Sequence, residues 1–295
     1  MQRRTFLKTA GATGLATILA RPLWAMSPKF ARYKDTMGLQ LYTLRNQIKD
    51  DLPGTIRAVA EAGYYQVELT KTVGAEPDVK AAQDAGLKVT SAMIDSRVLV
   101  TPDAEGVPTF DAILETAGRF ELRYLVIPYI GKGNRETVDQ FKANAERANR
   151  MGEKCKAAGI QLCYHNHAFE FGPLPGGKTG WDVFLEEFEP GLVKLELDVF
   201  WAAIGGKDPA ETIRTLKGRI AQLHLKDLKA GVDTTWDESK VPRDAFQEVG
   251  DGVVDWNAVL QAAEETGVAQ CHVEQDQSPD PVASIGQSMR YLKKL

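Results

Sequence analysis

Three strand-like segments of the sequence end in side chains that can bind a metal ion. Asp198 ends one apolar run, His224 lies near the end of a second, and Glu274 follows a third. Carboxylate oxygens together with one imidazole nitrogen suit Mn²⁺, Mg²⁺, Co²⁺ or Zn²⁺. The strands of a (β/α)8 barrel bring their carboxyl ends to one site. One Asp, one His and one Glu on three such strands therefore predict a divalent-metal site.

A fourth ligand is expected from the polar segment that follows another apolar run. Strand alternation places Cys163, His165 and His167 on one face of this segment. We predict His165 as the fourth ligand, with His167 and Glu170 as the alternatives. His165 and Glu274 are also the candidates for moving a proton.

A second group of polar side chains is expected to surround the metal site. Lys226 lies two residues after His224 and is predicted to act as an acid, a base or a clamp on a substrate oxygen. A solvated lysine at the rim is the alternative. The candidates for contact with a substrate are Glu68, Gln40, Tyr42, His167, Glu170 and Trp236. Each of these can also have a structural role, and Trp236 lies in a long irregular stretch, 229–251, that can form a lid or a surface loop.

Eight strand-like segments alternate with helix-like segments. They are Gly38–Thr43, Gln66–Leu69, Leu87–Thr90, Tyr124–Ile130, Ile160–Cys163, Lys194–Asp198, Ile220–Leu225 and Val268–Cys271. Glycines at 63, 86, 159 and 267 follow helix-like segments, as is typical of helix ends. The alternation predicts a parallel sheet. Eight units, without a Gly-rich phosphate turn after the first, favour a single-domain (β/α)8 TIM barrel over residues 37–295.

The first 25 residues have the pattern of a cleavable export signal. Arg3 and Arg4 precede a short apolar stretch and a small residue, Ala25, at a plausible cleavage site. The stretch is much shorter than the roughly 20 residues that a membrane span needs. We predict a twin-arginine signal over 1–25, a linker over 26–36, and a periplasmic or secreted protein without membrane contact after cleavage. An uncleaved anchor is the alternative.

The composition is that of an ordinary globular protein and argues against a disulfide-stabilised scaffold, a cysteine-based metal site and a nucleic-acid-binding protein. The 295 residues are 43% hydrophobic and 26% charged, which allows a large core without disulfides. The three cysteines show no metal-binding spacing and are expected to be buried thiols. Cleavage after residue 25 would remove four basic residues and no acidic one, so the net charge would move from −4 to −8. We therefore expect no nucleic-acid partner.

With these residues the chain resembles the sugar phosphate isomerase/epimerase superfamily of xylose isomerase-like TIM barrels. The resemblance rests on the segments 164–167, 197–198, 223–227, 250–256 and 273–276. Members usually hold a divalent ion through a Glu, an Asp, a His and a Glu after strands five to eight, and Asp198, His224 and Glu274 match the last three. His165 stands where epimerases have the first Glu. The Tyr-His-Asn-His segment looks closest to the inosose-dehydratase-like branch.

The resemblance implies an enzyme that uses one divalent ion, Mn, Mg, Co or Zn, and acts on a small-molecule carbohydrate. The expected substrate is a free sugar, a keto-sugar or a cyclitol, converted by an isomerase or epimerase through an enediolate. Glu274 or His165 would move the proton, and Lys226 would assist at the oxygen. A lyase or dehydratase, inosose-dehydratase-like or acting on keto-glycosides, would share that intermediate. A non-catalytic sugar-binding barrel is the alternative from another class, and a homo-oligomer is compatible with either.

Overall fold

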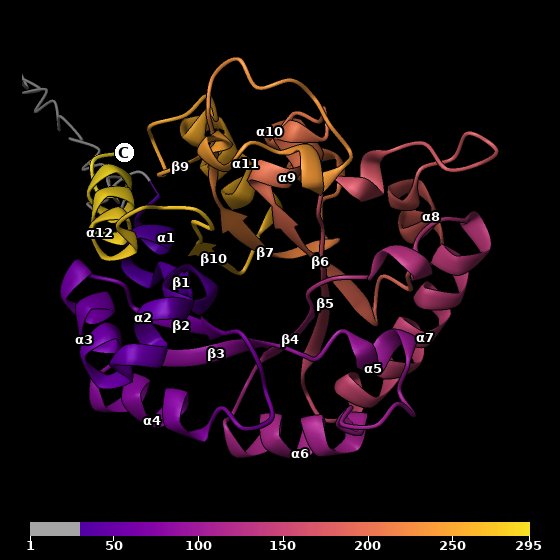
Figure 1. Ribbon diagram of the computed structural model, residues 1–295, viewed down its shortest axis with the longest axis horizontal. Helices are drawn as coiled ribbons and strands as arrows, with labels where there is room; N and C mark the ends of the chain where they lie inside the picture. Colours follow the sequence, from indigo (N-terminus) through magenta and orange to yellow (C-terminus); the bar gives the residue numbers. More distant parts are fainter. Residues whose placement is uncertain (1–29) are drawn as a thin grey trace, which may run out of the picture.

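A closed barrel of eight parallel strands forms the centre of the protein, and helices surround it (Figure 1). The structure is a computed structural model and describes residues 30–295. The barrel strands are β1 (Gly38–Gln40), β2 (Gln66–Leu69), β3 (Lys88–Met93), β4 (Tyr124–Ile127), β5 (Gln161–His165), β6 (Val193–Asp198), β7 (Ile220–Leu225) and β10 (Gln270–Val273). Each pairs with the next, and β10 closes the ring on β1. The predicted single-domain TIM barrel is confirmed.

Two strands, β2 and β7, have the predicted bounds, and others differ for local reasons. The first strand ends at Gln40 instead of Thr43, because the chain turns into the 3-10 helix η2 (Leu41–Leu44). The Gln40 side chain caps this turn by accepting a hydrogen bond from the backbone N–H of Tyr42. Strand β4 ends at Ile127 because the next residue, Pro128, has no N–H to continue the ladder.

The helices alternate with the strands as predicted. They are α1 (Ala31–Thr36), α2 (Arg45–Asp50), α3 (Leu52–Ala62), α4 (Glu76–Asp84), α5 (Arg97–Val100), α6 (Phe110–Arg119), α7 (Val138–Ala157), α8 (Gly180–Glu187), α9 (Val199–Ile204), α10 (Pro209–Thr215), α11 (Trp256–Thr266) and α12 (Pro281–Leu292). Gly63 and Gly267 follow α3 and α11 with φ of 95° and 79°, the left-handed conformation that glycine adopts without steric cost.

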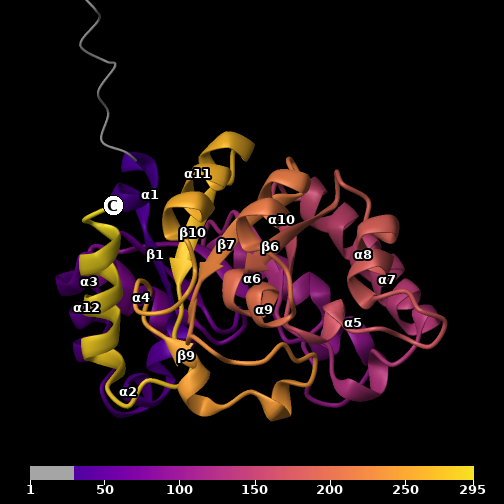
Figure 2. The ribbon, with the colours of Figure 1, turned by 90° about the horizontal axis from the view of Figure 1, so that it is seen from above.

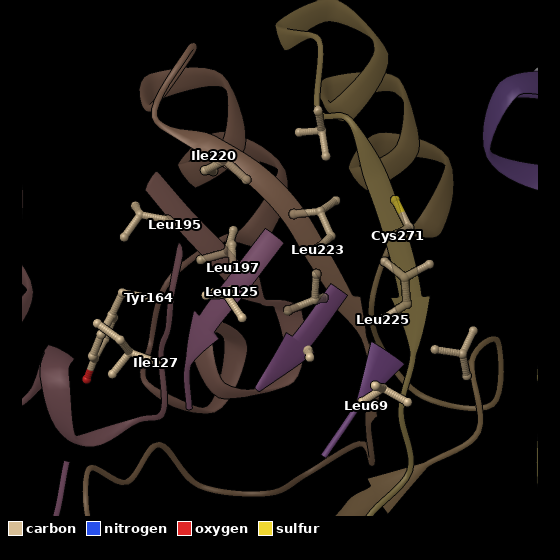
Figure 3. Close-up of a cluster of buried hydrophobic side chains, with 14 of the residues drawn as sticks. Leu69, Leu125, Ile127, Tyr164, Leu195, Leu197, Ile220, Leu223, Leu225 and Cys271 are labelled. Carbon is tan, nitrogen blue, oxygen red and sulfur yellow. The ribbon is translucent and has the colours of Figure 1, made fainter. Parts of the chain in front are cut away.

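The outward faces of the strands form the main hydrophobic core. Leu125, Tyr164, Leu195 and Leu197 are buried there between the strands and the surrounding helices (Figure 3). The three cysteines are free and buried, as expected. Burial of this apolar surface supplies the main driving force for closing the barrel.

The inside of the barrel is polar along one side, which is unusual for a packed barrel core. Gln222 on β7 donates a hydrogen bond to Ser91 on β3, so the two side chains meet across the interior. Thr90 on β3 reaches Gln270 on β10 in the same way. Buried polar groups are costly unless they are hydrogen-bonded. The interior is therefore built as a connected polar network, which continues upward to the predicted metal ligands.

The described chain begins inside the predicted linker. Residues 31–36 form α1, which lies at the end of the barrel opposite the strand carboxyl ends (Figure 2). Tyr33 of α1 is buried and donates a hydrogen bond to the carbonyl oxygen of Val268. The second half of the predicted linker thus belongs to the fold, while the predicted signal, 1–25, lies outside the described residues. Between residues 30 and 295, no helix combines the length and hydropathy needed to span a membrane.

Candidate active site

The four predicted metal ligands lie together at the carboxyl ends of β5, β6, β7 and β10. His165, Asp198, His224 and Glu274 each offer one ligand atom, and these atoms lie within 4.8 Å of one another. His224 Nδ1 lies 3.0 Å from Glu274 Oε2 and 4.0 Å from Asp198 Oδ2. His165 Nε2 lies 3.9 Å from the same Asp198 oxygen. We call these four residues the upper cluster.

Strand register explains why residues far apart in sequence meet here. Asp198 is paired with His224 across β6 and β7, and His224 is paired with His272 across β7 and β10. Glu274 lies two residues beyond His272, so alternation directs it to the same face at a higher level. His165 ends β5. The site is thus a consequence of parallel strands that stop at similar heights.

The upper cluster has the chemical character of a divalent-metal site. It combines two carboxylates with two imidazoles, a donor set that suits borderline and hard divalent ions. Asp198 Oδ2 is buried without a hydrogen-bond partner, although its other oxygen accepts from the Trp201 backbone. Its nearest cationic contact is the Lys226 ammonium, whose Nζ lies 3.3 Å away without making a hydrogen bond, so the oxygen keeps a lone pair for a metal ion. The residues present therefore fit a divalent ion.

Lys226 is fully enclosed by acidic partners. Its Nζ lies 2.8 Å from Glu274 Oε2, 2.9 Å from Asp276 Oδ2 and 3.3 Å from Asp198 Oδ2. The side chain is 1% exposed, which excludes the alternative of a solvated lysine at the rim. Lys226 therefore places a fixed positive charge next to Asp198 and Glu274, two of the predicted metal ligands.

The neighbours of each buried group decide its protonation. Burial would lower the pKa of Lys226, but Asp198 and Asp276 raise it well above its usual range. Burial would raise the pKa of Glu274, but the Lys226 ammonium holds it well below its usual range. Burial, together with the charge of His224, lowers the pKa of His165 far enough to keep this imidazole neutral. The site thus contains a charged lysine, a charged carboxylate and a neutral histidine.

A cavity of about 430 Å³ opens above the upper cluster. Its walls include Tyr42, His165, His167, Trp201 and Lys226. Small-molecule sites usually measure about 300–1,000 Å³ and combine apolar walls with a few polar groups. The volume and the lining suit one small ligand that reaches the upper cluster.

Three predicted substrate contacts do not belong to the cavity wall. Glu68 and Gln40 are buried below the upper cluster, where Gln40 donates a hydrogen bond to Glu68. Glu170 accepts hydrogen bonds from the Tyr164 hydroxyl and the His167 backbone N–H, so it fixes the turn after β5. Burial raises the pKa of Glu170 to about 8. These buried side chains hold neighbouring residues of the site in place by hydrogen bonds and do not line the cavity.

Trp236 also lies away from the cavity. Its indole N–H donates to the carbonyl oxygen of Gly205, and the side chain is 46% exposed. By contrast, Tyr42 and His167 line the cavity as predicted. The sequence placed Trp236 in the correct loop, but contacts with distant segments turn its ring outward.

The long stretch 229–251 crosses the mouth of the barrel and acts as its cover. Strands β8 (Asp227–Leu228) and β9 (Phe246–Gln247) pair antiparallel and hold its two ends together. In Figure 2 the arrows of β7 and β10 point toward this segment. At its far side, Glu238 accepts hydrogen bonds from the Tyr129 hydroxyl and from Arg135. Of the two readings left open by the sequence, a covering loop is therefore the one observed.

Several polar residues of the site were not predicted from the sequence. Glu196 lies two residues before Asp198, and His272 lies two residues before Glu274. The same alternation that predicted the ligands places both on the inner face. Asp276, the partner of Lys226, follows Glu274 by the same spacing. Applying the two-residue period in both directions from each ligand would have identified all three.

A (β/α)8 barrel with a buried cluster of histidines and carboxylates at its strand ends defines a class of barrel proteins suited to metal-assisted chemistry. The model of one such family, described as the xylose isomerase-like TIM barrel, matches residues 56–295. The chain belongs to this family.

Individual relatives agree with this assignment. The inosose dehydratase of Geobacillus kaustophilus (strain HTA426) is 25% identical over 243 residues, which are 71% of this chain and 77% of that protein. A sugar phosphate isomerase/epimerase from Parabacteroides distasonis ATCC 8503 is 25% identical with a TM-score of 0.71, covering 89% and 95% of the two chains. The IOLI protein, solved with a zinc atom, shares the fold at 15% identity and a TM-score of 0.64, covering 88% and 95%.

The comparisons confirm the resemblance noted from the sequence and the prediction of an enzyme. Family members are isomerases, epimerases or dehydratases that act on small-molecule carbohydrates. The alternative of a non-catalytic sugar-binding barrel is overturned by this membership.

Proposed function

We propose that the protein is a divalent-metal-dependent isomerase or epimerase that moves a proton next to the carbonyl group of a free sugar, keto-sugar or cyclitol. The observation that carries the proposal is the meeting of four ligand atoms within 4.8 Å, beside the charged Lys226. A divalent ion held by His165, Asp198, His224 and Glu274 would polarise a carbonyl and its neighbouring hydroxyl, which lowers the cost of losing the α proton.

The side chains around the cavity supply the remaining steps. Glu274 is charged and lines the cavity, so its carboxylate is the candidate base for the α proton. His165 is the second candidate because its imidazole is neutral. The Lys226 ammonium would stabilise the oxygen that gains negative charge in the enediolate. Return of the proton to the neighbouring carbon, or to the opposite face, completes isomerisation or epimerisation.

A dehydratase is the second candidate, because one further acid lines the same wall. Asp276 borders the cavity and contacts Lys226. Burial raises the pKa of this carboxyl to about 6, with Lys226 opposing the shift. After the α proton is removed, Asp276 can protonate a hydroxyl on the β carbon, which then leaves as water. The name of the Geobacillus relative supports this reading.

The charges of the cavity support an uncharged substrate. Arg243 and Lys226 are the cationic residues among those that line the cavity. Lys226 is occupied by three carboxylates, and Arg243 donates to Gln277 through Nε, so the terminal N–H groups of Arg243 are the free cationic donors of this wall. A phosphate needs several free donors. The lining therefore favours a free sugar or cyclitol over a sugar phosphate.

The test is solvent exchange followed by product analysis. The metal-loaded protein is incubated in D₂O with a panel of aldoses, keto-sugars, inososes and keto-glycosides, and NMR follows deuterium at the α carbon. An exchanged substrate with an isomer or epimer as product supports the first candidate. Exchange with loss of water supports the second. Absence of exchange across the panel at saturating metal argues against both.

His165→Ala is expected to abolish α-proton exchange even at saturating metal. The substitution removes one of the four ligands and one of the two candidate proton carriers. Lys226→Met is the informative comparison, because it should slow the step at oxygen while the bound ion is retained. Exchange rates and metal content are measured together on both variants. Full exchange in the His165 variant would assign the role on this strand to His167, which lines the cavity, because Glu170 lies behind it.

We also propose export of the folded protein by the twin-arginine route to the periplasm or the exterior. The support is the Arg3-Arg4 pair before a short apolar stretch. Replacing both arginines by lysine is expected to keep the protein in the cytoplasm, because the pair is the export signal that the sequence contains. Cell fractionation with an antibody to the protein measures this outcome. Unchanged export of the double variant would contradict it.

A further inference from the structure

A second group of ligand-type side chains lies directly below the upper cluster. Glu68, Glu196 and His272, together with the far side of His224, offer ligand atoms within 4.8 Å of one another. His224 Nε2 lies 2.8 Å from Glu68 Oε1 and 3.2 Å from Glu196 Oε2. The side chains of all four are completely buried. We call Glu68, Glu196 and His272 the lower cluster, with His224 shared between the two levels.

The carboxylates of the lower cluster are held by fixed amide and hydroxyl donors. Gln40 and Ser91 donate hydrogen bonds to the two oxygens of Glu68. Gln222 donates to Glu196 Oε1. Metal ligands in proteins are commonly oriented by such outer partners. This arrangement fixes the direction of both carboxylates and leaves Glu196 Oε2 without a hydrogen-bond donor.

The ring of His272 gives a second, independent indication that a ligand binds here. Both of its ring nitrogens are buried and have no hydrogen-bond partner. Buried polar groups are nearly always paired, so two unpaired nitrogens on one ring require an explanation. Room for the ring is provided by Gly38 on β1, where an added Cβ would collide with His272 Cδ2. The barrel therefore accommodates an imidazole that makes no hydrogen bond within it.

We propose that the lower cluster is a second divalent-metal site, held by Glu68, Glu196 and His272 and completed by the shared His224. Two imidazoles and two carboxylates suit a borderline ion such as Zn²⁺ or Co²⁺. With both sites filled, each ring nitrogen of His224 would bind one ion, and the N–H protons that the ring carries would pass to solvent. This inference goes beyond the proposed reaction, and its expected count of two ions rests on the metal binding proposed for the upper cluster.

The charges at the two levels are consistent with two ions. As ionised ligands, Asp198 and Glu274 would provide two negative charges above, and Glu68 and Glu196 would provide two below. Each divalent ion would therefore be neutralised by its own pair of carboxylates. Lys226 retains Asp276 as a separate partner at 2.9 Å. A buried charge is tolerated when it is balanced in this way.

Metal stoichiometry tests the proposal directly. Chelator-stripped full-length protein is equilibrated with excess Zn²⁺, passed through a desalting column and analysed for metal. Wild type is expected to retain two ions per chain. Glu196→Gln and His272→Gln should each retain one, held by the upper cluster. Glu170→Gln and His167→Gln change a carboxyl and an imidazole outside both clusters and should retain two.

Titration with Co²⁺ gives a second readout that does not depend on activity. The absorption bands of the first Co²⁺ are expected to shift when a second equivalent enters in wild type, because the ions share His224, and to stay unshifted in His272→Gln. One ion in wild type at saturation, or two in both lower-cluster variants, would overturn the proposal. If a variant does not fold, the wild-type stoichiometry and band shift still decide the question. Saturation at one ion would identify the lower cluster as outer support for His224.

Discussion

Glu274→Gln is expected to lower the rate of α-proton exchange by about 10²- to 10⁴-fold at saturating metal, the usual loss when a general acid or base is removed. The amide keeps the shape of the side chain but cannot accept the proton. It also removes the charge that lies 2.8 Å from Lys226 Nζ and 3.0 Å from His224 Nδ1. The exchange rate is measured by NMR in D₂O and divided by the ion content of the same sample.

The correction for bound metal separates the two roles of this residue. If Glu274 only held the ion, the rate per bound ion would return to the wild-type value when metal saturates the variant, and the proposed base would be wrong. Glu264→Gln is the matched control, because it makes the same chemical change at an exposed position on α11. It is expected to retain the full exchange rate.

Strand alternation together with the barrel rule was sufficient to predict the upper cluster. Asp198 ends β6, His224 is the second-last residue of β7, and Glu274 directly follows β10. The carboxyl ends of the strands of a (β/α)8 barrel converge. His165 followed from alternation on β5, which also placed the ring of Tyr164 in the outer core. These are local patterns of the sequence. Once the strands close into a barrel, the residues at their carboxyl ends must lie close together, so no long-range contact has to be known in advance.

Other features depend on contacts that no local pattern contains. Gln40 ends β1 and Glu68 is the second-last residue of β2, as expected for cavity residues, yet both lie below the cavity. Glu68 contacts His224 there, and Gln40 donates a hydrogen bond to Glu68. Trp236 points outward because its indole meets Gly205, 31 residues away. Glu238 covers the cavity through Arg135, 103 residues away. The height of a side chain in the barrel and the path of a long loop are set by such partners.

The polar interior of the barrel is another feature that the sequence pattern alone did not predict. Glu196 and Gln222 alternate with leucines, which is the pattern of a strand with one polar face exposed to water. Here the polar face is turned inward and the leucines face the helices. A closed ring of strands allows this inversion because the polar side chains find partners across the barrel. Alternation in the sequence predicts that a strand has two different faces, but it does not predict which face is exposed to solvent.

His224→Ala is expected to remove divalent metal from the upper cluster, with a loss of affinity greater than about 100-fold. Loss of an outer partner of a metal ligand already costs about 10- to 100-fold, and here the ligand itself is removed. Its Nδ1 lies 3.0 Å from Glu274 Oε2 and 4.0 Å from Asp198 Oδ2, so the substitution leaves two carboxylates without the imidazole between them.

Elemental analysis after incubation with one equivalent of Mn²⁺, Co²⁺ or Zn²⁺ measures this loss. Wild type should carry about one ion per chain, and the variant should carry close to none. His167→Ala is the control, because it removes an imidazole from the cavity wall that is not one of the four ligands, and its metal content should match wild type. Equal metal content in wild type and His224→Ala would show that the ion, if bound, is held elsewhere.

A parallel melting curve with and without metal gives the same answer by linkage, since an ion that binds only the folded state raises the melting temperature. That increase should be present in wild type and His167→Ala and absent in His224→Ala.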